Sequence, residues 1–368
     1  MHLSFTIVYQ MCNGVLRALS KGTEMKKLLG ICLASWLALS TPIQVQARAD
    51  QIQLQENHPQ EYVVVKGDTL WDISGHFLKK PWRWPELWDV NPQIDDPHWI
   101  YPGDILYLTW VNGQPKLRLK DDRMQPRARV SKLDGAIPAI PLKDLHAFLS
   151  DNVVLDDELL KQTPYVLGGR NERIIAGAGD RIYARGEIEQ GHIEQNVYRP
   201  AKEYIDPETK ELLGYELLKV AEARITALNG DITSLDLVKS REEVRVLDRV
   251  IPSPETRIQS VFYPVAAPVD VSGEILSVLR GVTKIGRYDA VAINKGSREG
   301  LKSGHVFVVY TRGEVIVDPI TKEKISLPAE EAGTLMIFKT FEKVSYGLVM
   351  TATNVLSIGD TIRSPDFE

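Results

Sequence analysis

The sequence predicts a multi-domain α+β protein. A small βααβ domain comes first, followed by a mostly antiparallel β tail of two related barrel-like or sandwich-like modules with a short helical segment before them. Three observations lead to this prediction. The chain has 368 residues, enough for two or three domains. Helix-like spacing of apolar residues is confined to short stretches near residues 70–88 and 142–168. The remainder is dominated by alternating, β-branched segments interrupted by glycine, which is typical of short antiparallel strands.

Composition shifts divide the chain into six expected segments. They are a signal peptide (1–47), a polar linker (48–60), a compact domain (61–109), a connector with room for one strand (110–141), a first β module with a helical lead-in (142–268) and a second, related β module (269–368). In the lead-in, Leu145, Phe148 and Leu149 predict one short helix, and Leu155, Leu159 and Leu160 predict another.

The first 47 residues have the features of a secretory signal. A basic start at Met25–Lys27 precedes an apolar run at 28–39, which is too short to span a bilayer comfortably. Small residues stand at the −3 and −1 positions of a cleavage site after Ala47. We therefore expect translation to begin at Met25 and the protein to reach the periplasm, with no transmembrane span after cleavage. A retained membrane anchor is the alternative, and lipid attachment at Cys32 is disfavoured because Ile31 is large.

Removal of this segment makes the chain more acidic and leaves it without cysteine. Without Arg17, Lys21, Lys26, Lys27 and Glu24, the 44 basic and 49 acidic side chains become 40 and 48, a net charge of −8. Such a charge does not attract phosphate backbones, which argues against nucleic acid as a partner. Cys12 and Cys32 both precede the expected cut, so the mature chain has no disulfide and no cysteine nucleophile.

The β tail contains an internal repeat. The segment at 198–210, YRPAKEYIDPETK, lies 112 positions before the segment at 310–322, YTRGEVIVDPITK, and the same offset relates 247–250 to 359–362. Asp-Pro followed by Thr-Lys suits a tight hairpin turn, because proline fixes φ and aspartate can bond the backbone ahead of it. Two matches in one register predict a duplicated β module, which describes architecture and not activity.

Residues 61–109 are expected to fold as strand, helix, helix and strand. The predicted elements are a strand at 62–65, a helix at 70–78 capped by Asp68 or Thr69, a second helix that opens at 84–88 and ends at Asn91, a turn at 100–104 and a strand at 105–108.

This unit resembles the LysM domain, whose pattern is Tyr-x-Val-x-x-Gly-Asp-Thr-Leu-x-x-Ile, a helix that reaches Asn, and Ile-x-Pro-Gly-x-x-Leu. The matching residues are Tyr62, Val64, Gly67, Asp68, Thr69, Leu70, Ile73, Leu87, Asn91, Ile100, Pro102, Gly103 and Leu106. The resemblance covers only this part of the chain. It implies binding of N-acetylglucosamine-containing glycans such as peptidoglycan, in a shallow groove between the first strand–helix turn and the last helix–strand turn.

The residue types suit such a ligand, because an acetylated sugar needs apolar walls and exposed backbone groups. The candidate glycan-binding residues are Gly67, Asp68, Thr69, Leu70 and Trp71 on one lip, Ile100, Tyr101, Pro102 and Gly103 on the other, and Asn91. Structural roles remain open for several of them: Asp68 or Thr69 as a helix cap, Leu70 as core, and Asn91 as a helix end.

Five of the seven tryptophans fall inside this unit: Trp71, Trp82, Trp84, Trp88 and Trp99. They either complete a very small core or, at Trp82 and Trp84, extend the sugar platform or dock a protein.

Motifs for catalysis are missing from the mature sequence. Its six histidines are scattered, and it has no H-E-x-x-H, G-x-S-x-G or S-x-x-K pattern. We therefore predict a protein that is not an enzyme and that holds no metal or cofactor.

Three further segments, at 141–150, 164–168 and 177–186, extend the resemblance over most of the mature chain. Together with the LysM-like unit and the signal, they resemble the secretin-associated LysM protein family of type IV pilus systems (TsaP), with a last module similar to the C-terminal domain of the flagellar assembly protein T. The resemblance implies a periplasmic anchor that holds peptidoglycan while the β modules contact an outer-membrane secretin. A cell-wall hydrolase or its activator, and a general envelope protein without a secretin partner, are the alternatives.

Overall fold

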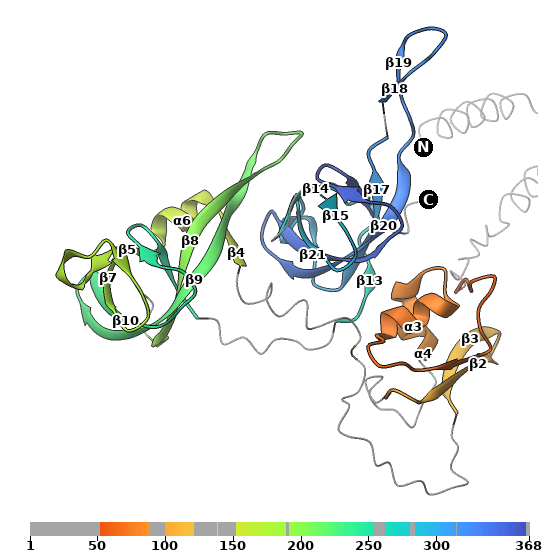
Figure 1. Ribbon diagram of the computed structural model, residues 1–368, viewed down its shortest axis with the longest axis horizontal. Coiled ribbons are helices and arrows are strands. Elements are labelled where there is room, and N and C mark those ends of the chain that lie inside the picture. Colours follow the sequence, from red (N-terminus) through yellow and green to blue (C-terminus); the bar gives the residue numbers. More distant parts are fainter. Residues whose placement is uncertain are drawn as a thin grey trace, which may run out of the picture. The chain divides into compact units, whose positions relative to one another are not determined.

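The computed structural model describes residues 52–88, 100–120, 138, 152–188, 191–253, 262–279, 284–313 and 315–365 (Figure 1). The expected signal peptide, both cysteines, Asn91, Trp99 and the helix expected at Leu145–Leu149 lie outside these residues. The residues from 52 onward belong to one compact unit, which is described below by itself.

The N-terminal domain is LysM-like, as the sequence predicts. Strands β1 (Glu61–Val63), β2 (Ile105–Val111) and β3 (Gln114–Leu119) form an antiparallel sheet in the order β1-β2-β3. Helices α3 (Leu70–Phe77) and α4 (Trp84–Trp88), with the 3₁₀ turn η1 (Pro81–Arg83) between them, follow β1 (Figure 1). The connector strand expected after residue 109 is β3.

The core of this domain is built from apolar residues at helical spacing. Leu70, Ile73 and Phe77 lie on one face of α3 and are buried with Leu87 and Ile100. The described tryptophans of the unit, Trp71, Trp82, Trp84 and Trp88, are buried as well. The core role is therefore confirmed for Trp84 and Trp88, whereas Trp71 and Trp82 are buried in a separate cluster described below. Neither Trp82 nor Trp84 is an exposed platform.

The first β module is a closed six-stranded barrel. Its strands are β5 (Tyr165–Gly169), β7 (Arg181–Arg185), β8 (Glu194–Ile205), β9 (Leu212–Asn229), β10 (Ile232–Ser240) and β12 (Arg249–Pro252). They are hydrogen-bonded in the order β10-β7-β5-β12-β8-β9, and the pairing of β9 with β10 closes the ring. Alternate apolar residues such as Ile182 and Ala184 on β7 fill the interior.

Four short elements accompany the first barrel. Strand β4 (Asn152–Leu155) pairs with β9, helix α6 (Asp157–Gln162) follows it, and β6 (Ile175–Ala176) pairs with β11 (Val244–Arg245). The expected helical lead-in thus contains one described helix, flanked by the strands β4 and β5 that apolar spacing did not predict. Val153 and Val154 are β-branched and favour the strand, which then gains its hydrogen bonds from the distant β9.

The second β module is a barrel of the same kind. Its strands are β14 (Ser272–Val278), β16 (Ala290–Ile293), β17 (His305–Thr311), β20 (Glu330–Thr340), β21 (Ser345–Ala352) and β23 (Thr361–Arg363). The order is β17-β20-β21-β16-β14-β23, and the pairing of β17 with β23 closes the ring. Short elements complete it: β13 (Val265–Ala266) beside β17, the pair β15 (Lys284–Ile285) and β22 (Leu356–Ser357), the pair β18 (Val315–Val317) and β19 (Lys324–Ser326), and the turn η3 (Ser297–Glu299).

The two barrels match strand by strand, as expected of the duplication. Up to the end of β7 and β16, equivalent residues of the two barrels lie 109 positions apart in the sequence. From β8 and β17 onward they lie 112 positions apart. Asp180 accepts a hydrogen bond from the Gly177 N–H, and Asp289 accepts the equivalent bond from the Gly286 N–H. Asp248 and Asp360 repeat this arrangement near the C-terminal strands.

Equivalent positions also share unusual backbone geometry. The φ angle is +73° at Leu247 and +89° at its counterpart Gly359, and it is +90° at Gly179 and +68° at its counterpart Tyr288. The same left-handed conformation is therefore held by glycine in one barrel and by a side-chain-bearing residue in the other.

The second barrel has apolar residues on the outside as well as the inside. Val291 and Ile293 of β16 point into the barrel, whereas Ala290 and Ala292 belong to a second buried cluster. This outer cluster contains, from the barrel, Leu279, Ala290, Ala292, Val306, Met336, Phe338, Val344, Tyr346, Leu348 and Met350. It is covered by residues from other parts of the chain: Trp71, Trp82, Val154, Tyr204, Leu213 and Phe262.

Candidate functional site

Two turns of the N-terminal domain form what we call the corner: one between β1 and α3, at Gly67, and one before β2, at Gly103. The first of these turns is stabilised by Asp68. Its carboxylate accepts hydrogen bonds from the Val65 N–H (2.8 Å) and the Tyr62 hydroxyl (3.0 Å), and the Asp68 N–H donates to the Val65 carbonyl (3.1 Å). Burial, together with the bond to Asp68, raises the pKa of Tyr62 to about 12. Asp68 therefore shapes the turn, and its neighbour Gly67 has a φ of +102° with open space where a Cβ would stand.

The start of α3 is fixed by a capping box. The Thr69 hydroxyl accepts a hydrogen bond from the Asp72 N–H (3.1 Å), and the Thr69 N–H donates to the Asp72 carboxylate (3.2 Å). The Leu70 N–H, which has no partner inside the helix, donates to the carbonyl of Pro138 in the connector (3.1 Å). Two N–H groups of the first helical turn, those of Leu70 and Asp72, are therefore satisfied by the chain itself.

The second turn resembles the first in its chemistry. Asp104 accepts a hydrogen bond from the Tyr101 N–H (3.0 Å), and Gly103 has a φ of +95° with open space at its Cβ position. Val64 joins the two turns, since its carbonyl accepts from the Gly103 N–H (2.8 Å) and its N–H donates to the Asp104 carbonyl (2.9 Å). The two turns thus lie side by side, each with one open glycine.

The candidate residues differ in how far solvent reaches them. Gly67 and Gly103 are exposed, Asp68, Tyr101 and Pro102 are half-buried, Thr69, Leu70, Trp71 and Ile100 are buried, and Asn91 lies outside the described residues. Leu70 and Ile100 belong to the domain core, whereas Trp71 belongs to the outer cluster of the second barrel. Of the candidate residues, the two glycines and the three half-buried residues are therefore the ones that solvent reaches.

Apolar side chains extend this surface along β1 and just beyond it. Val63 and Val65 are exposed, on the opposite side of the strand from the buried Val64. Sequence reasoning treated them as part of a strand without assigning them a role. The signal that could have found them is their alternation with Val64 next to a glycine turn.

The arrangement suits a neutral ligand. It offers exposed main chain at two glycines, apolar edges from valines, and a partly open tyrosine at Tyr101. Asp68 and Asp104, the carboxylates of the two turns, are engaged with backbone N–H groups. Among the residues that the structure describes, no group of histidine, cysteine and acidic side chains could hold a metal ion.

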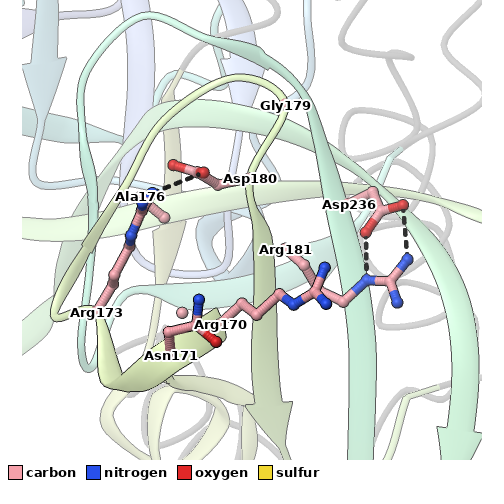
Figure 2. Close-up of a pocket in the computed structure, with 9 residues that line it drawn as sticks. Arg170, Asn171, Arg173, Ala176, Gly179, Asp180, Arg181 and Asp236 are labelled. Atoms are coloured by element: carbon pink, nitrogen blue, oxygen red, sulfur yellow. Dashed lines mark hydrogen bonds and ion pairs between the residues drawn. The ribbon is translucent and has the colours of Figure 1, made fainter.

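A separate cavity of about 480 Å³ lies in the first barrel, between η2 (Arg170–Glu172) and the start of β7 (Figure 2). It is lined by Gly169, Arg170, Asn171, Arg173, Ala176, Gly179, Asp180, Arg181 and Asp236. Arg181 donates to both oxygens of Asp236 (2.6 and 3.0 Å), and Arg173 donates to Asp180 (3.1 Å). These pairs neutralise most of the charge at the wall of the cavity.

The second barrel has apolar residues at two positions equivalent to the lining of this cavity. Leu279 and Ala290 stand at the positions of Arg170 and Arg181, and both are buried in the outer cluster. The strands of the two barrels are therefore equivalent here, but the side chains at these positions are charged in the first barrel and apolar in the second.

Comparison with known proteins identifies the N-terminal domain. Residues 62–109 match the LysM domain. A 60-residue stretch is 41% identical to a protein of Bacillus subtilis (strain 168) described as uncharacterized protein YqbP; it covers 14% of this chain and 27% of that protein. No helix within the described residues combines the length and the hydropathy that a membrane crossing requires. The chain thus carries a LysM domain, a module that binds carbohydrate and is not catalytic.

Proposed function

We propose that this protein is a non-catalytic, peptidoglycan-binding protein of the periplasm, which anchors an outer-membrane secretin of a type IV pilus to the cell wall. The observation that supports the binding half is the corner of the LysM domain. There Gly67 and Gly103 leave the main chain open on two adjacent turns that Val64 joins.

The corner recognises a glycan by shape and backbone bonding. An acetamido sugar brings an amide, which pairs with exposed main-chain groups, and an apolar ring face, which packs on Val65 and Tyr101. No ion pair contributes, so retention on peptidoglycan should be nearly independent of salt between 50 and 500 mM, roughly the range over which charge-based binding falls steeply.

A matched pair of glycine variants tests this site. Gly67 (φ +102°) and Gly113 (φ +79°, in the turn between β2 and β3) both have positive φ and open space at the Cβ position. Alanine at either position should cost about 1–2 kcal/mol of stability through the left-handed conformation. Only Gly67→Ala places a methyl group in the proposed groove, so only this variant should lose retention on purified sacculi.

The outcomes separate the alternatives. Equal retention by the two variants, or a wild-type protein that stays in the supernatant, would overturn the glycan site. Release of labelled fragments from peptidoglycan by the wild type would instead indicate a hydrolase, whatever the variants do.

The secretin half rests on the resemblance of residues 141–186 and of the β tail to the secretin-associated family. Two barrels without a catalytic motif suit a scaffold that contacts a partner. Crosslinking in cells through residues 110–368 should recover a secretin, and recovery of no envelope protein would count against this half. The periplasmic location depends on the signal in residues 1–47, and fractionation of cells that express the full chain tests it.

A further inference from the structure

The turn between β8 and β9 binds the second barrel. We call residues Tyr204–Leu213 the first hairpin tip. Asp206 accepts a hydrogen bond from the Asn294 side-chain amide (2.9 Å), and Glu211 accepts from Arg298 (2.9 and 3.1 Å) and forms an ion pair with Lys343 (2.8 Å). The tip thus offers two carboxylates to one amide and two cations.

Apolar contacts accompany these polar ones. Tyr204 and Leu213, at the two ends of the first hairpin tip, are 1% and 2% exposed and belong to the outer cluster of the second barrel. Phe338 and Tyr346 of the barrel lie in the same cluster. The first hairpin tip is therefore a docking element with an apolar base and an acidic end.

The second barrel carries a copy of this element. We call residues Ile316–Ile325, which comprise the turn between β18 and β19 and the adjoining ends of both strands, the second hairpin tip; Figure 1 shows this hairpin projecting from its barrel. Asp318 and Glu323 stand at the positions of Asp206 and Glu211, and Ile316 and Ile325 stand at those of Tyr204 and Leu213. One difference is Lys324, which replaces the half-buried Leu212.

The two turns have the same backbone geometry. Asp206 accepts from the N–H groups of Glu208 and Thr209 (both 2.9 Å), and Asp318 accepts from those of Ile320 and Thr321 (2.7 and 3.1 Å). The φ angle is +61° at both Lys210 and Lys322. The two tips are thus preorganised alike, and preorganisation lowers the cost of docking.

The two hairpin tips differ in the burial of their apolar residues. Ile316 is 42% exposed and Ile325 43%, although their counterparts in the first hairpin tip are almost completely buried. Val315 and Val317 are exposed as well, so β18 presents three consecutive apolar residues to solvent. Such a patch on a sheet edge is typical of an interaction site.

The described part of this chain offers no open face that matches the second hairpin tip. The outer face of the second barrel is occupied by the first hairpin tip. On the first barrel, the equivalents of Ala292, Asn294 and Leu348 are Tyr183, Arg185 and Asp236. Arg185 and Asp236 each bear an ion pair, and an apolar tip would not bury itself against them.

We propose that the second hairpin tip docks on a different protein, whose surface resembles the outer face of the second barrel: an apolar sheet face edged by a carboxamide and by basic side chains. Ile316 and Ile325 pack on its apolar part, and Glu323 pairs with its cations as Glu211 pairs with Arg298 and Lys343. The proposal goes beyond glycan binding and does not depend on it.

Photo-crosslinking in cells tests the proposal. A benzoylphenylalanine is placed at Ile316 of the full-length chain, and a control is placed at Val355, an exposed valine of the same barrel. We expect an adduct with another protein from position 316 and none from position 355. Glu323→Lys should reduce the yield of that adduct about tenfold, as expected for one charge pair, whereas Glu330→Lys, an exposed glutamate on β20, should leave it unchanged.

Three outcomes would overturn the proposal. They are the absence of an adduct at position 316, an adduct with a second copy of this chain only, and an adduct that Glu323→Lys does not weaken. Loss of retention on sacculi affects none of them, so the glycan site and this docking site fail independently.

Discussion

Residues at equivalent positions of the two hairpin tips should differ sharply in what they contribute to stability. Leu213→Ala removes three carbon atoms from a side chain that is 2% exposed, which costs roughly 2.4 kcal/mol at about 0.8 kcal/mol for each carbon. The cavity that remains against the second barrel brings the expected loss to about 2–5 kcal/mol. Ile325→Ala, at the counterpart that is 43% exposed, should cost at most about 1 kcal/mol, the span of strand propensities.

The assay is thermal or urea unfolding of the mature chain followed by far-UV circular dichroism. Every tryptophan lies within residues 36–110, so tryptophan fluorescence would follow the N-terminal domain and the contact of Trp71 and Trp82 with the second barrel, and not the unfolding of the barrels themselves. Because the chain has several domains, the variants are compared by the transition of the second barrel and not by a single global midpoint.

The first hairpin tip is packed against the second barrel, whereas the second hairpin tip is exposed to solvent. This contrast is the basis of the prediction. Equal losses for the two variants would refute it, because they would mean that the first hairpin tip is not held against the second barrel in solution. A loss below about 1 kcal/mol for Leu213→Ala would have the same meaning.

Other predictions concern single groups. Thr69→Ala removes the cap of α3 and should lower the stability of the LysM domain by about 1 kcal/mol in fluorescence-detected unfolding. The hydrogen bonds from Arg298 and Lys343 lower the pKa of Glu211 to about 2. Its stabilising contribution should be complete above its ordinary pKa and be lost as pH falls toward about 2, and Glu211→Gln should remove this dependence. Tyr62 should ionise near pH 12, and Asp68→Asn should lower that value in an absorbance titration.

Much of the fold could be predicted from local patterns. The spacing of Leu70, Ile73 and Phe77 predicted α3, and the repeated Asp-Pro-x-Thr-Lys segment predicted two related modules. These signals are local because each turn or helix is fixed by residues a few positions apart. Closure of the barrels was not predictable in this way. In the first barrel β12 pairs with β5 and β8, and β10 pairs with β7, and such distant pairing leaves little trace in a short window.

The candidate site was predicted in part. The two glycine turns were identified from their motif, and the structure places them side by side through Val64. The packing of Trp71 in the outer cluster, and not in the core of its own domain, was not foreseen. Most residues of that cluster come from the second barrel, more than 200 positions away, and helical spacing carries no information about them. Pro138, whose carbonyl accepts the Leu70 N–H, gave no signal of any kind.

The positions at which one barrel has glycine and the other a larger residue have a consequence for how the chain could be improved. Leu247 and Tyr288 hold a conformation that costs an L-residue about 1–2 kcal/mol, while Gly359 and Gly179 adopt it freely in the sister barrel. Each barrel thus indicates a strained position in the other barrel, and glycine at that position would relieve the strain. The substitutions Leu247→Gly and Tyr288→Gly would therefore remove the backbone strain at these two positions.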